Sequence, residues 1–425
     1  MDVIIVGGGV SGLMSAIHLK NKLKDKVKIT ILERLEKVGK KILATGNGKC
    51  NFTNTGIVNN NNIKENYSNP KFVSNILSKY DYPYIKKYLE NLGLYSKELS
   101  EGRVYPYTEQ ASTFLDVLRL NINKLGIEIE NNYEVNKIAF KDNKFLVYNK
   151  NKRAFYLTCD KLILACGGKS AQILGSNGSG YDILKALKLK VSPFKPGLVG
   201  IKSDVNTLKT INGLRCKAMV SLYQKKAKKI VKSEFGEVQF KNDGLSGIVV
   251  MNLSNYIAHN PSNYNILLDL LPDYSLDDVK KILKKKQEDY GEFEISNLLT
   301  GLLPKTLSMV ILKKASIDLS IYIKDLNTRS LNKIANFMKE LPFEVKGDYG
   351  FDKSQISVGG LEVSELDPDT LEVKKIPNLY VAGELINVDG KCGGFNFHWA
   401  LASGIACSDG ISLRKKDTNV RNKRS

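Results

Sequence analysis

The chain has 425 residues and a formal net charge of +20 at pH 7, and this length exceeds what one hydrophobic core usually organises, so two or three domains are expected. No stretch approaches the roughly 20 consecutive apolar residues of a membrane span, and the first apolar run lacks the basic leader of a signal peptide. Six scattered cysteines form no C-x-x-C pair, which argues against a disulfide framework or a zinc site. We therefore expect a reduced, cytosolic protein with no membrane partner.

The first dozen residues, MDVIIVGGGVSG, contain the clearest motif of the chain. The pattern predicts a buried strand over Val3–Val6, a glycine turn, and a helix over Val10–Leu23. Gly7, Gly9 and Gly12 fit G-x-G-x-x-G, in which the glycines permit a tight turn, close approach of a pyrophosphate, and close packing of helix on strand. The helix N-terminus then offers free N–H groups to phosphate.

An acid and a second glycine-rich segment follow this motif. Glu33 ends a predicted strand over Val27–Leu32, about 20 residues past the glycines, where a carboxylate accepts ribose hydroxyls in dinucleotide-binding folds. The next segment, Lys37–Asn54, is dense in glycine, asparagine, threonine and lysine. Small residues let the backbone approach a flat ligand and lysines neutralise phosphate, so we expect this segment to contact the same ligand.

Helices and strands alternate through the next hundred residues. Helical spacing predicts helices over Pro70–Leu92 and Glu109–Leu125, after a polar surface segment over Asn59–Asn69. The loop between the two helices holds Arg103 among aromatic residues. Ile127–Ala165 alternates as strands do, and its last run enters another glycine turn.

The composition changes after about residue 190. Val191–Ile257 contains short strand-like runs, and Ser275–Leu341 is mostly helical with Lys-rich faces. Ser275, with Asp278 three residues later, predicts the N-cap of the first of these helices. Buried strands and glycine turns return near residue 350, and the basic tail from Arg414 is predicted to be disordered.

The C-terminal segment contains two further glycine motifs. A buried strand within Ile376–Val388 leads to Gly383 and Glu384, and Lys391–Ala406 has a glycine pair, ending at Gly394, that opens an apolar helix. This arrangement resembles the C-terminal half of a two-dinucleotide-type FAD domain. The resemblance implies that Gly383 and Glu384 lie by the FAD pyrophosphate and ribityl chain, and that the positive helix end faces the flavin pyrimidine.

The resemblance extends over nearly the whole chain. GGGVSGLMSA, GKKILATGNGKCNFTN, EGRVYPYTEQAS, LACGGKS, GSNGSGY, GLSG and VAGELINVDGKCGGFNFHWALASG resemble, in this order, the YhiN/BaiN-type flavoproteins, also described as aminoacetone oxidase-like FAD-binding proteins. The implied fold class is α/β: a discontinuous, two-dinucleotide-type FAD-binding Rossmann domain with an inserted β-rich plus helical module. The expected segments are 1–190 (FAD domain), 191–270 (β-rich insert), 271–346 (helical insert) and 347–425 (FAD domain with the basic tail).

The implied cofactor is FAD, with NADPH or NADH as reductant. The residues expected to hold FAD lie in the glycine turns, after the predicted strands and at the start of the last helix. They are Gly7, Gly9, Ser11, Gly12, Glu33, Arg34, Lys40, Lys41, Thr45, Gly46, Asn47, Gly48, Asn51, Val135, Ala165, Gly167, Gly383, Glu384, Gly393, Gly394, Phe395 and Asn396.

The reaction implied by the resemblance is reduction of an activated carbon–carbon double bond, which requires a general acid within about 3 Å of the accepting carbon. Cys50 is the first candidate because it lies in the glycine loop; the alternative is a small buried residue that packs under the flavin. Tyr105 and Tyr107, beside Arg103, are second candidates, with aromatic packing as the alternative. No metal site is expected.

Three positions depart from the family pattern. Lys49 stands where the family has arginine, which keeps the charge but loses the planar fork. Cys392 and His398 stand where relatives often have other residue types, so no role is transferred to them.

Two substrates fit the resemblance: uridine in large-subunit (23S) ribosomal RNA, reduced to dihydrouridine, and a small-molecule enone such as a steroid or bile-acid intermediate. The net charge, the Lys-rich predicted helices and the basic tail favour ribosomal RNA as the partner. If the lysine excess reflects composition alone, it no longer favours RNA, and the small molecule is the expected substrate. A third alternative, of another class, is a non-catalytic flavin redox sensor.

Overall fold

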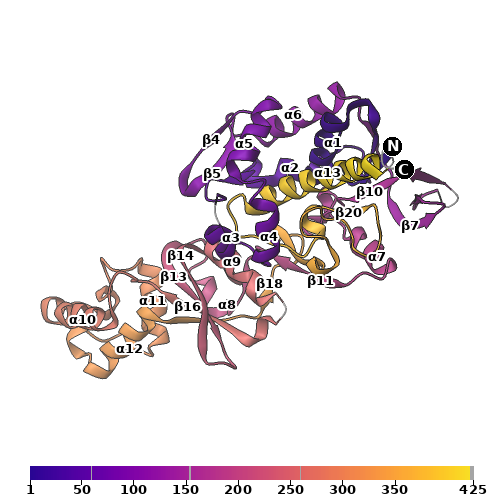
Figure 1. The fold of residues 1–425 in the computed structure, drawn as a ribbon. Helices are drawn as coiled ribbons and strands as arrows, with labels where there is room; N and C mark the ends of the chain where they lie inside the picture. The colour runs from indigo at the N-terminus through magenta and orange to yellow at the C-terminus, as the bar shows by residue number, and fades with distance from the viewer. Residues whose placement is uncertain (59, 153–154, 259, 422–425) are drawn as a thin grey trace. The chain divides into compact units, whose positions relative to one another are not determined.

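The computed structural model describes residues 1–58, 60–152, 155–258 and 260–421, and divides into two compact units (Figure 1). Unit 1 combines Met1–Pro196 with Gln355–Ser425, and unit 2 is Gly197–Ser354. The finer division of the insert into a β-rich and a helical segment stays a prediction.

A five-stranded parallel sheet forms the centre of unit 1, in the order β20-β10-β1-β2-β6. β1 (Asp2–Val6) lies between β2 (Lys28–Leu32) and β10 (Lys161–Leu164), and β6 (Glu128–Glu130) and β20 (Leu379–Val381) are the edges. Because the strands are parallel, their carboxyl ends meet at one edge of the sheet. The first glycine turn, Glu33 and the glycine turns at Gly167 and Gly383 all follow strands at this edge.

Two long helices pack against each other beside this sheet (Figure 1). α1 (Val10–Leu23) has the predicted bounds, and α13 (Phe395–Arg421) is the longest helix described. The Ser15 hydroxyl on α1 donates to the Gly404 carbonyl on α13 over 3.0 Å. The helix is assigned as far as Arg421, the disorder expected from Arg414 stays a prediction, and residues 422–425 lie outside the described chain.

The single helix predicted over Pro70–Leu92 is wrong. The segment forms α4 (Pro70–Leu77) and α5 (Tyr82–Asn91), because the Asp81 carboxylate caps α5 by accepting a backbone N–H of its first turn, and a proline stands in that turn. An N-cap with a following proline starts a helix rather than continuing one.

The other elements of unit 1 are mostly short. The predicted strand within Ile376–Val388 is reduced to β20, and the polar segment before α4 contains a helix, with residue 59 outside the described chain. The helices are α2 (Lys40–Ala44), α3 (Asn60–Asn66), α6 (Ala111–Lys124) and α7 (Ser179–Ala186). The strands are β3 (Thr53–Asn54), β4 (Ser96–Glu98), β5 (Arg103–Pro106), β7 (Val135–Lys141), β8 (Lys144–Asn149), β9 (Tyr156–Cys159), β11 (Val191–Gly197) and β19 (Ile356–Leu361).

Unit 2 has its own apolar core around a seven-stranded sheet in the order β17-β16-β13-β14-β15-β12-β18. Its strands are β12 (Ile201–Lys202), β13 (Arg215–Gln224), β14 (Lys229–Lys241), β15 (Gly244–Ser246), β16 (Tyr264–Asp269), β17 (Leu341–Glu344) and β18 (Gly347–Asp348). Its helices are α8 (Val205–Lys209), α9 (Ile248–Ile257), α10 (Leu276–Tyr290), α11 (Lys305–Lys314) and α12 (Thr328–Lys339). The N-cap predicted at Ser275 is confirmed, with Asp278 completing a capping box.

Candidate flavin and substrate site

The first glycine turn has the geometry that its spacing predicts. Gly7 has φ +109°, and a Cβ there would overlap the carbonyl of Ala165, directly after β10; a Cβ at Gly12 would overlap the carbonyl of Gly7. A Cβ at Gly9 would instead have no atom within 4 Å. Two glycines therefore allow close packing, and Gly9 leaves open space in front of the helix.

The start of α1 presents unsatisfied backbone donors to that space. Gly9 is the N-cap and no side chain caps the helix, so the N–H groups of its first turn are available to an anion. The Ser11 side chain lies directly beside Gly383, a residue with φ +72° that follows β20. The two ends of the chain thus meet at the helix N-terminus, an arrangement that fits a pyrophosphate.

The residues after β2 fit the adenosine half of a dinucleotide. The Glu33 carboxylate accepts the N–H of Gly8 over 2.9 Å and the N–H of Leu35 over 2.8 Å, which fixes the acid beside the glycine turn. Arg34 donates from Nη2 to the Gly175 carbonyl over 3.2 Å, while its Nε is buried without a partner. A buried unpaired donor indicates an acceptor that a ligand supplies.

Two further predicted residues lie in unit 1: Val135 begins β7, and Gly167 lies in the turn after β10. Val135 is buried, and Gly167 has φ +70° beside Ser176. Their contacts with FAD stay predictions.

A polar network joins α2 to the residues after β10 and β20. Lys41 Nζ lies 2.7 Å from the Glu384 carboxylate and 2.7 Å from the Ser170 hydroxyl. Glu384 also accepts the backbone N–H of Ser357 over 2.7 Å and the Ser170 hydroxyl over 3.0 Å. Residues 343 positions apart in the chain therefore form one half-buried ion pair at the predicted ribityl position. Lys40 instead pairs with the exposed Glu36.

The loop after α2 is exposed and tightly turned. Thr45 donates to the Ile42 carbonyl, and Gly46, Asn47 and Gly48 follow with φ between +55° and +84°. All three residues are exposed, so a planar ligand can approach this run. Asn51 instead donates to the carbonyls of Thr53 and Val104, which ties the loop to β3 and β5.

The N-terminus of α13 lies against the same strands. Gly393 and Gly394 have φ of +115° and +96°, and a Cβ at Gly394 would overlap the Thr53 carbonyl. Asn54 donates to the Gly393 carbonyl over 3.1 Å, and Arg103 lies beside Gly393 and pairs with Glu101.

The next two residues of α13 have structural partners. The Phe395 carbonyl accepts the Tyr67 hydroxyl, and the Asn396 side chain closes the loop at Gly390. Their contacts with FAD stay predictions.

The three candidate acids differ in access, and Tyr107, directly after β5, is 68% exposed. Cys50 is fully buried with φ +60°, and burial raises the pKa of its thiol to about 12. Tyr105 is half-buried on β5, beside Gly46 of the exposed loop. Burial favours the packing interpretation of Cys50, whereas Tyr105 is placed to reach a ligand.

His398 also lies in this region, and the sequence does not indicate its role. It is fully buried in α13, its Nδ1 lies 2.7 Å from the Thr53 hydroxyl, and its Nε2 lies 2.8 Å from the Tyr80 carbonyl. Desolvation lowers the pKa of His398 to about 4, so the ring is neutral and Nε2–H donates to the carbonyl. The histidine thus holds β3 against α13; its signal is a lone polar side chain in an otherwise apolar helical run.

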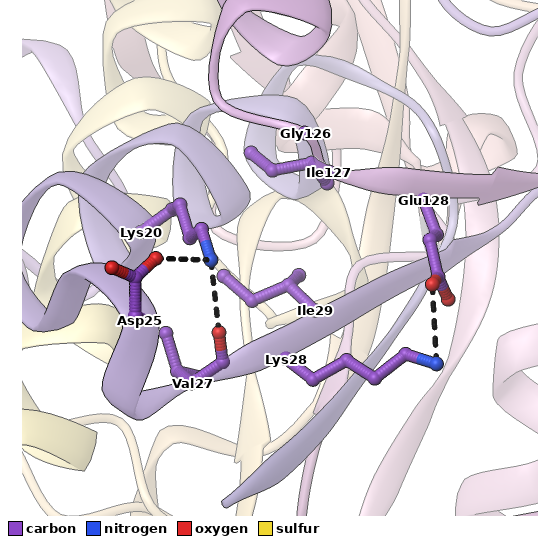
Figure 2. A pocket seen from close by; sticks show the side chains of 8 residues that line it. All are labelled: Lys20, Asp25, Val27, Lys28, Ile29, Gly126, Ile127 and Glu128. Carbon is purple, nitrogen blue, oxygen red and sulfur yellow. Dashed lines mark hydrogen bonds and ion pairs between the residues drawn. The ribbon is translucent and has the colours of Figure 1, made fainter.

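A surface hollow lies at the opposite edge of the parallel sheet (Figure 2). Lys28 and Glu128, which begin β2 and β6, form an ion pair of 3.1 Å across it, and Lys20 donates to the Val27 carbonyl over 3.2 Å. These polar groups pair with one another, and ligands of open parallel sheets bind at the carboxyl edge, so this hollow is not the candidate site.

Within the described residues, no cluster of three metal-ligating side chains occurs. No helix among them is long and apolar enough to cross a bilayer.

Comparison with known proteins agrees with this geometry. The family model described as HI0933-like protein Rossmann domain matches residues 1–410. A 3-dehydro-bile acid delta(4,6)-reductase of Clostridium scindens is 31% identical over 403 residues, 94% of this chain and 96% of that protein. A ribosomal RNA dihydrouridine synthase of Haemophilus influenzae is 28% identical over 419 residues, 96% of this chain and 98% of that protein.

A solved structure shares the fold at low identity. The 3-ketosteroid delta1-dehydrogenase from Sterolibacterium denitrificans superposes with a TM-score of 0.52 at 11% identity, over 97% of this chain and 99% of that one. The predicted fold class is therefore confirmed, as is the resemblance stated from the sequence motifs. The chain belongs to the HI0933-like Rossmann family and is an FAD-dependent oxidoreductase.

Proposed function

We propose that this chain reduces an activated carbon–carbon double bond, and that its substrate is uridine in large-subunit ribosomal RNA, converted to dihydrouridine. The names of the two full-length relatives, a delta(4,6)-reductase and a dihydrouridine synthase, both denote reduction of such a bond. The net charge of +20 is the observation that carries the choice of RNA, because a polyanionic substrate is attracted by excess positive charge.

When bound, FAD supplies the hydride for this reduction. NADPH or NADH is the reductant that reduces the flavin again. The first turn of α1 binds the pyrophosphate, and Glu33 and Arg34 hold the adenosine. Lys41 and Glu384 position the ribityl chain. The N-terminus of α13 provides the positive helix end toward the flavin pyrimidine.

The protein must also deliver a proton, to C5 of the uracil ring. We assign this role to the Tyr105 hydroxyl, because Tyr105 is accessible beside the Gly46 loop whereas Cys50 is fully buried. Arg103, on the same strand, orients the substrate carbonyl. The carbon that accepts hydride is C6, which is conjugated with the C4 carbonyl.

Nucleoside mass spectrometry of ribosomal RNA tests the substrate directly. Large-subunit RNA from the source organism is digested and compared with RNA from a strain that lacks this gene. We expect dihydrouridine, or a methylated form of it, to disappear from the mutant and to return when purified protein, FAD and NADPH are added. An unchanged nucleoside profile would contradict the RNA substrate.

A steroid-like enone is the second candidate, and the 31% identity to the bile acid reductase favours it. The same protein would then reduce a neutral enone with turnover that salt does not alter. Purified protein assayed side by side on ribosomal RNA and on a 3-oxo-4-ene steroid separates the two substrates.

A further inference from the structure

The β-hairpin formed by β13 and β14 in unit 2 carries the densest uncompensated charge we find in the described chain. Its tip, residues 224–233, contains five lysines and no acidic residue. Lys225 pairs with Glu344 over 3.3 Å. Lys226, Lys228 and Lys229 are exposed and have no ion-pair partner within the described residues.

The Lys-rich helix α10, by contrast, is not a basic surface. Residues 275–294 contain five lysines but six acidic residues. Lys280 pairs with Asp277 over 3.0 Å and Lys285 with Asp289 over 3.1 Å. The surplus charge of this unit therefore lies at the hairpin tip rather than on the helix that the sequence pattern favours.

One face of the same hairpin is open and carries an aromatic ring. Phe235 pairs with Met219 across the strands, and its side chain is 55% exposed; Val231, unpaired at the register shift nearer the tip, is 38% exposed. The opposite face is covered by α9: a Cβ at Gly236 would lie 2.6 Å from Val249, and Asn252 donates to Glu234 over 2.8 Å. Because side chains alternate along a strand, Phe235 points away from α9.

An exposed aromatic ring on an open sheet face, on a strand whose tip carries lysines, is suited to binding single-stranded RNA. Bases stack on the ring whatever their sequence, and lysines contact the phosphates. We propose that the β13–β14 hairpin binds single-stranded RNA, with Phe235 stacking on a base and Lys226, Lys228 and Lys229 contacting the backbone. This inference rests on the proposed RNA substrate and names the surface that holds it.

Two hairpin variants and a matched control test the proposal. The first replaces Lys226, Lys228 and Lys229 by Gln, and the second is Phe235→Ala. The control replaces three lysines of α10, Lys280, Lys281 and Lys284, by Gln, which removes the same charge from the same unit. All three must retain FAD, measured by flavin absorbance, as evidence that they fold.

Fluorescence anisotropy with a single-stranded oligouridine is measured over a range of KCl concentrations. Each phosphate contact to a single strand contributes about 0.7 to the slope of log affinity against log salt, so the hairpin lysine variant should lose about 2 from that slope. The α10 control should keep the wild-type slope. Phe235→Ala should weaken binding roughly 5- to 150-fold, as for the loss of one stacked base, with the slope unchanged.

Other outcomes identify which claim fails. If the wild type binds RNA and the hairpin variants bind as tightly as the α10 control, the hairpin is not the site, while the proposed substrate stands. If duplex RNA binds as tightly as single-stranded RNA and Phe235→Ala has no effect, the proposed stacking of a base on Phe235 is wrong. If the wild type binds only anionic phosphatidylserine vesicles and no RNA, both this inference and the RNA substrate are wrong.

Discussion

Tyr105 and Cys50 lie near the same exposed loop but differ in access to a substrate. Tyr105→Phe removes the hydroxyl proton and keeps the ring, so we expect substrate turnover to fall about 10²- to 10⁴-fold while reduction of the bound flavin by NADPH is unchanged. Cys50→Ala should keep turnover near the wild-type value, because its thiol is fully buried. Stopped-flow kinetics measures the two half-reactions separately. If Cys50→Ala loses turnover and Tyr105→Phe does not, the Cys50 thiol is the proton donor instead.

His398 makes the stability of unit 1 depend on pH. Its pKa is lowered from 6.5 to about 4 in the folded protein, so between these values the unfolded chain binds more protons than the folded one. Stability therefore rises with pH across that window, by roughly 3 kcal/mol. Thermal unfolding from pH 4 to pH 7 should show this slope in the wild type.

His398→Gln is the matched control, since an amide keeps a donor and an acceptor but does not titrate. The difference in melting temperature between the variant and the wild type should change with pH only between about pH 4 and pH 6.5. Identical pH profiles for the two proteins would show that His398 does not titrate in this range.

At the scale of elements, the start of α13 depends on a glycine that allows close approach. Gly394→Ala adds a Cβ that would overlap the Thr53 carbonyl at φ +96°, and we expect the protein to lose most of its bound FAD. Gly93→Ala is the control, because Gly93 has φ +95° but nothing within 4 Å of an added Cβ. Flavin absorbance per mole of purified protein measures both. Equal FAD content in the two variants would mean that this turn does not form the site.

The capping box of α10 gives a second prediction at this scale. Ser275→Ala removes the side-chain acceptor of the Asp278 N–H, a loss of about 1 kcal/mol in helix stability. Hydrogen exchange should become faster in the first turn of α10 and stay unchanged in α12, which has its own cap at Asn327. Ser78→Ala, an exposed serine outside any N-cap, should leave exchange in α10 as it is.

Local patterns predict some elements closely and others poorly. The helix over Val10–Leu23 has the expected bounds because a glycine turn and a buried strand fix its start. The helix expected over Pro70–Leu92 is divided because apolar spacing continues through Asp81, whose capping role overrides it. The spacing of apolar residues indicates which face of a helix is buried, whereas capping residues determine where the helix begins.

The site shows the same division between local and distant information. The glycines that approach a ligand or another strand could be predicted from the sequence, since few other residues adopt their backbone conformations. The Lys41–Glu384 pair and the two hydrogen bonds of His398 join residues more than 300 positions apart. Such contacts depend on the tertiary fold, so the sequence supplies the residues but not their pairing.

At the scale of the whole molecule, the net charge of +20 has two possible meanings, and turnover distinguishes them. If the charge recruits RNA, both association and affinity depend on released counterions, so kcat/KM on ribosomal RNA should fall at least tenfold between about 50 and 200 mM KCl. Turnover of a neutral enone by the same preparation involves no phosphate and should change little. If instead RNA turnover keeps its rate in high salt, the lysines reflect composition rather than recognition. The choice between the two substrates would then rest on the site of unit 1 alone, where the same hydride and proton reach either double bond.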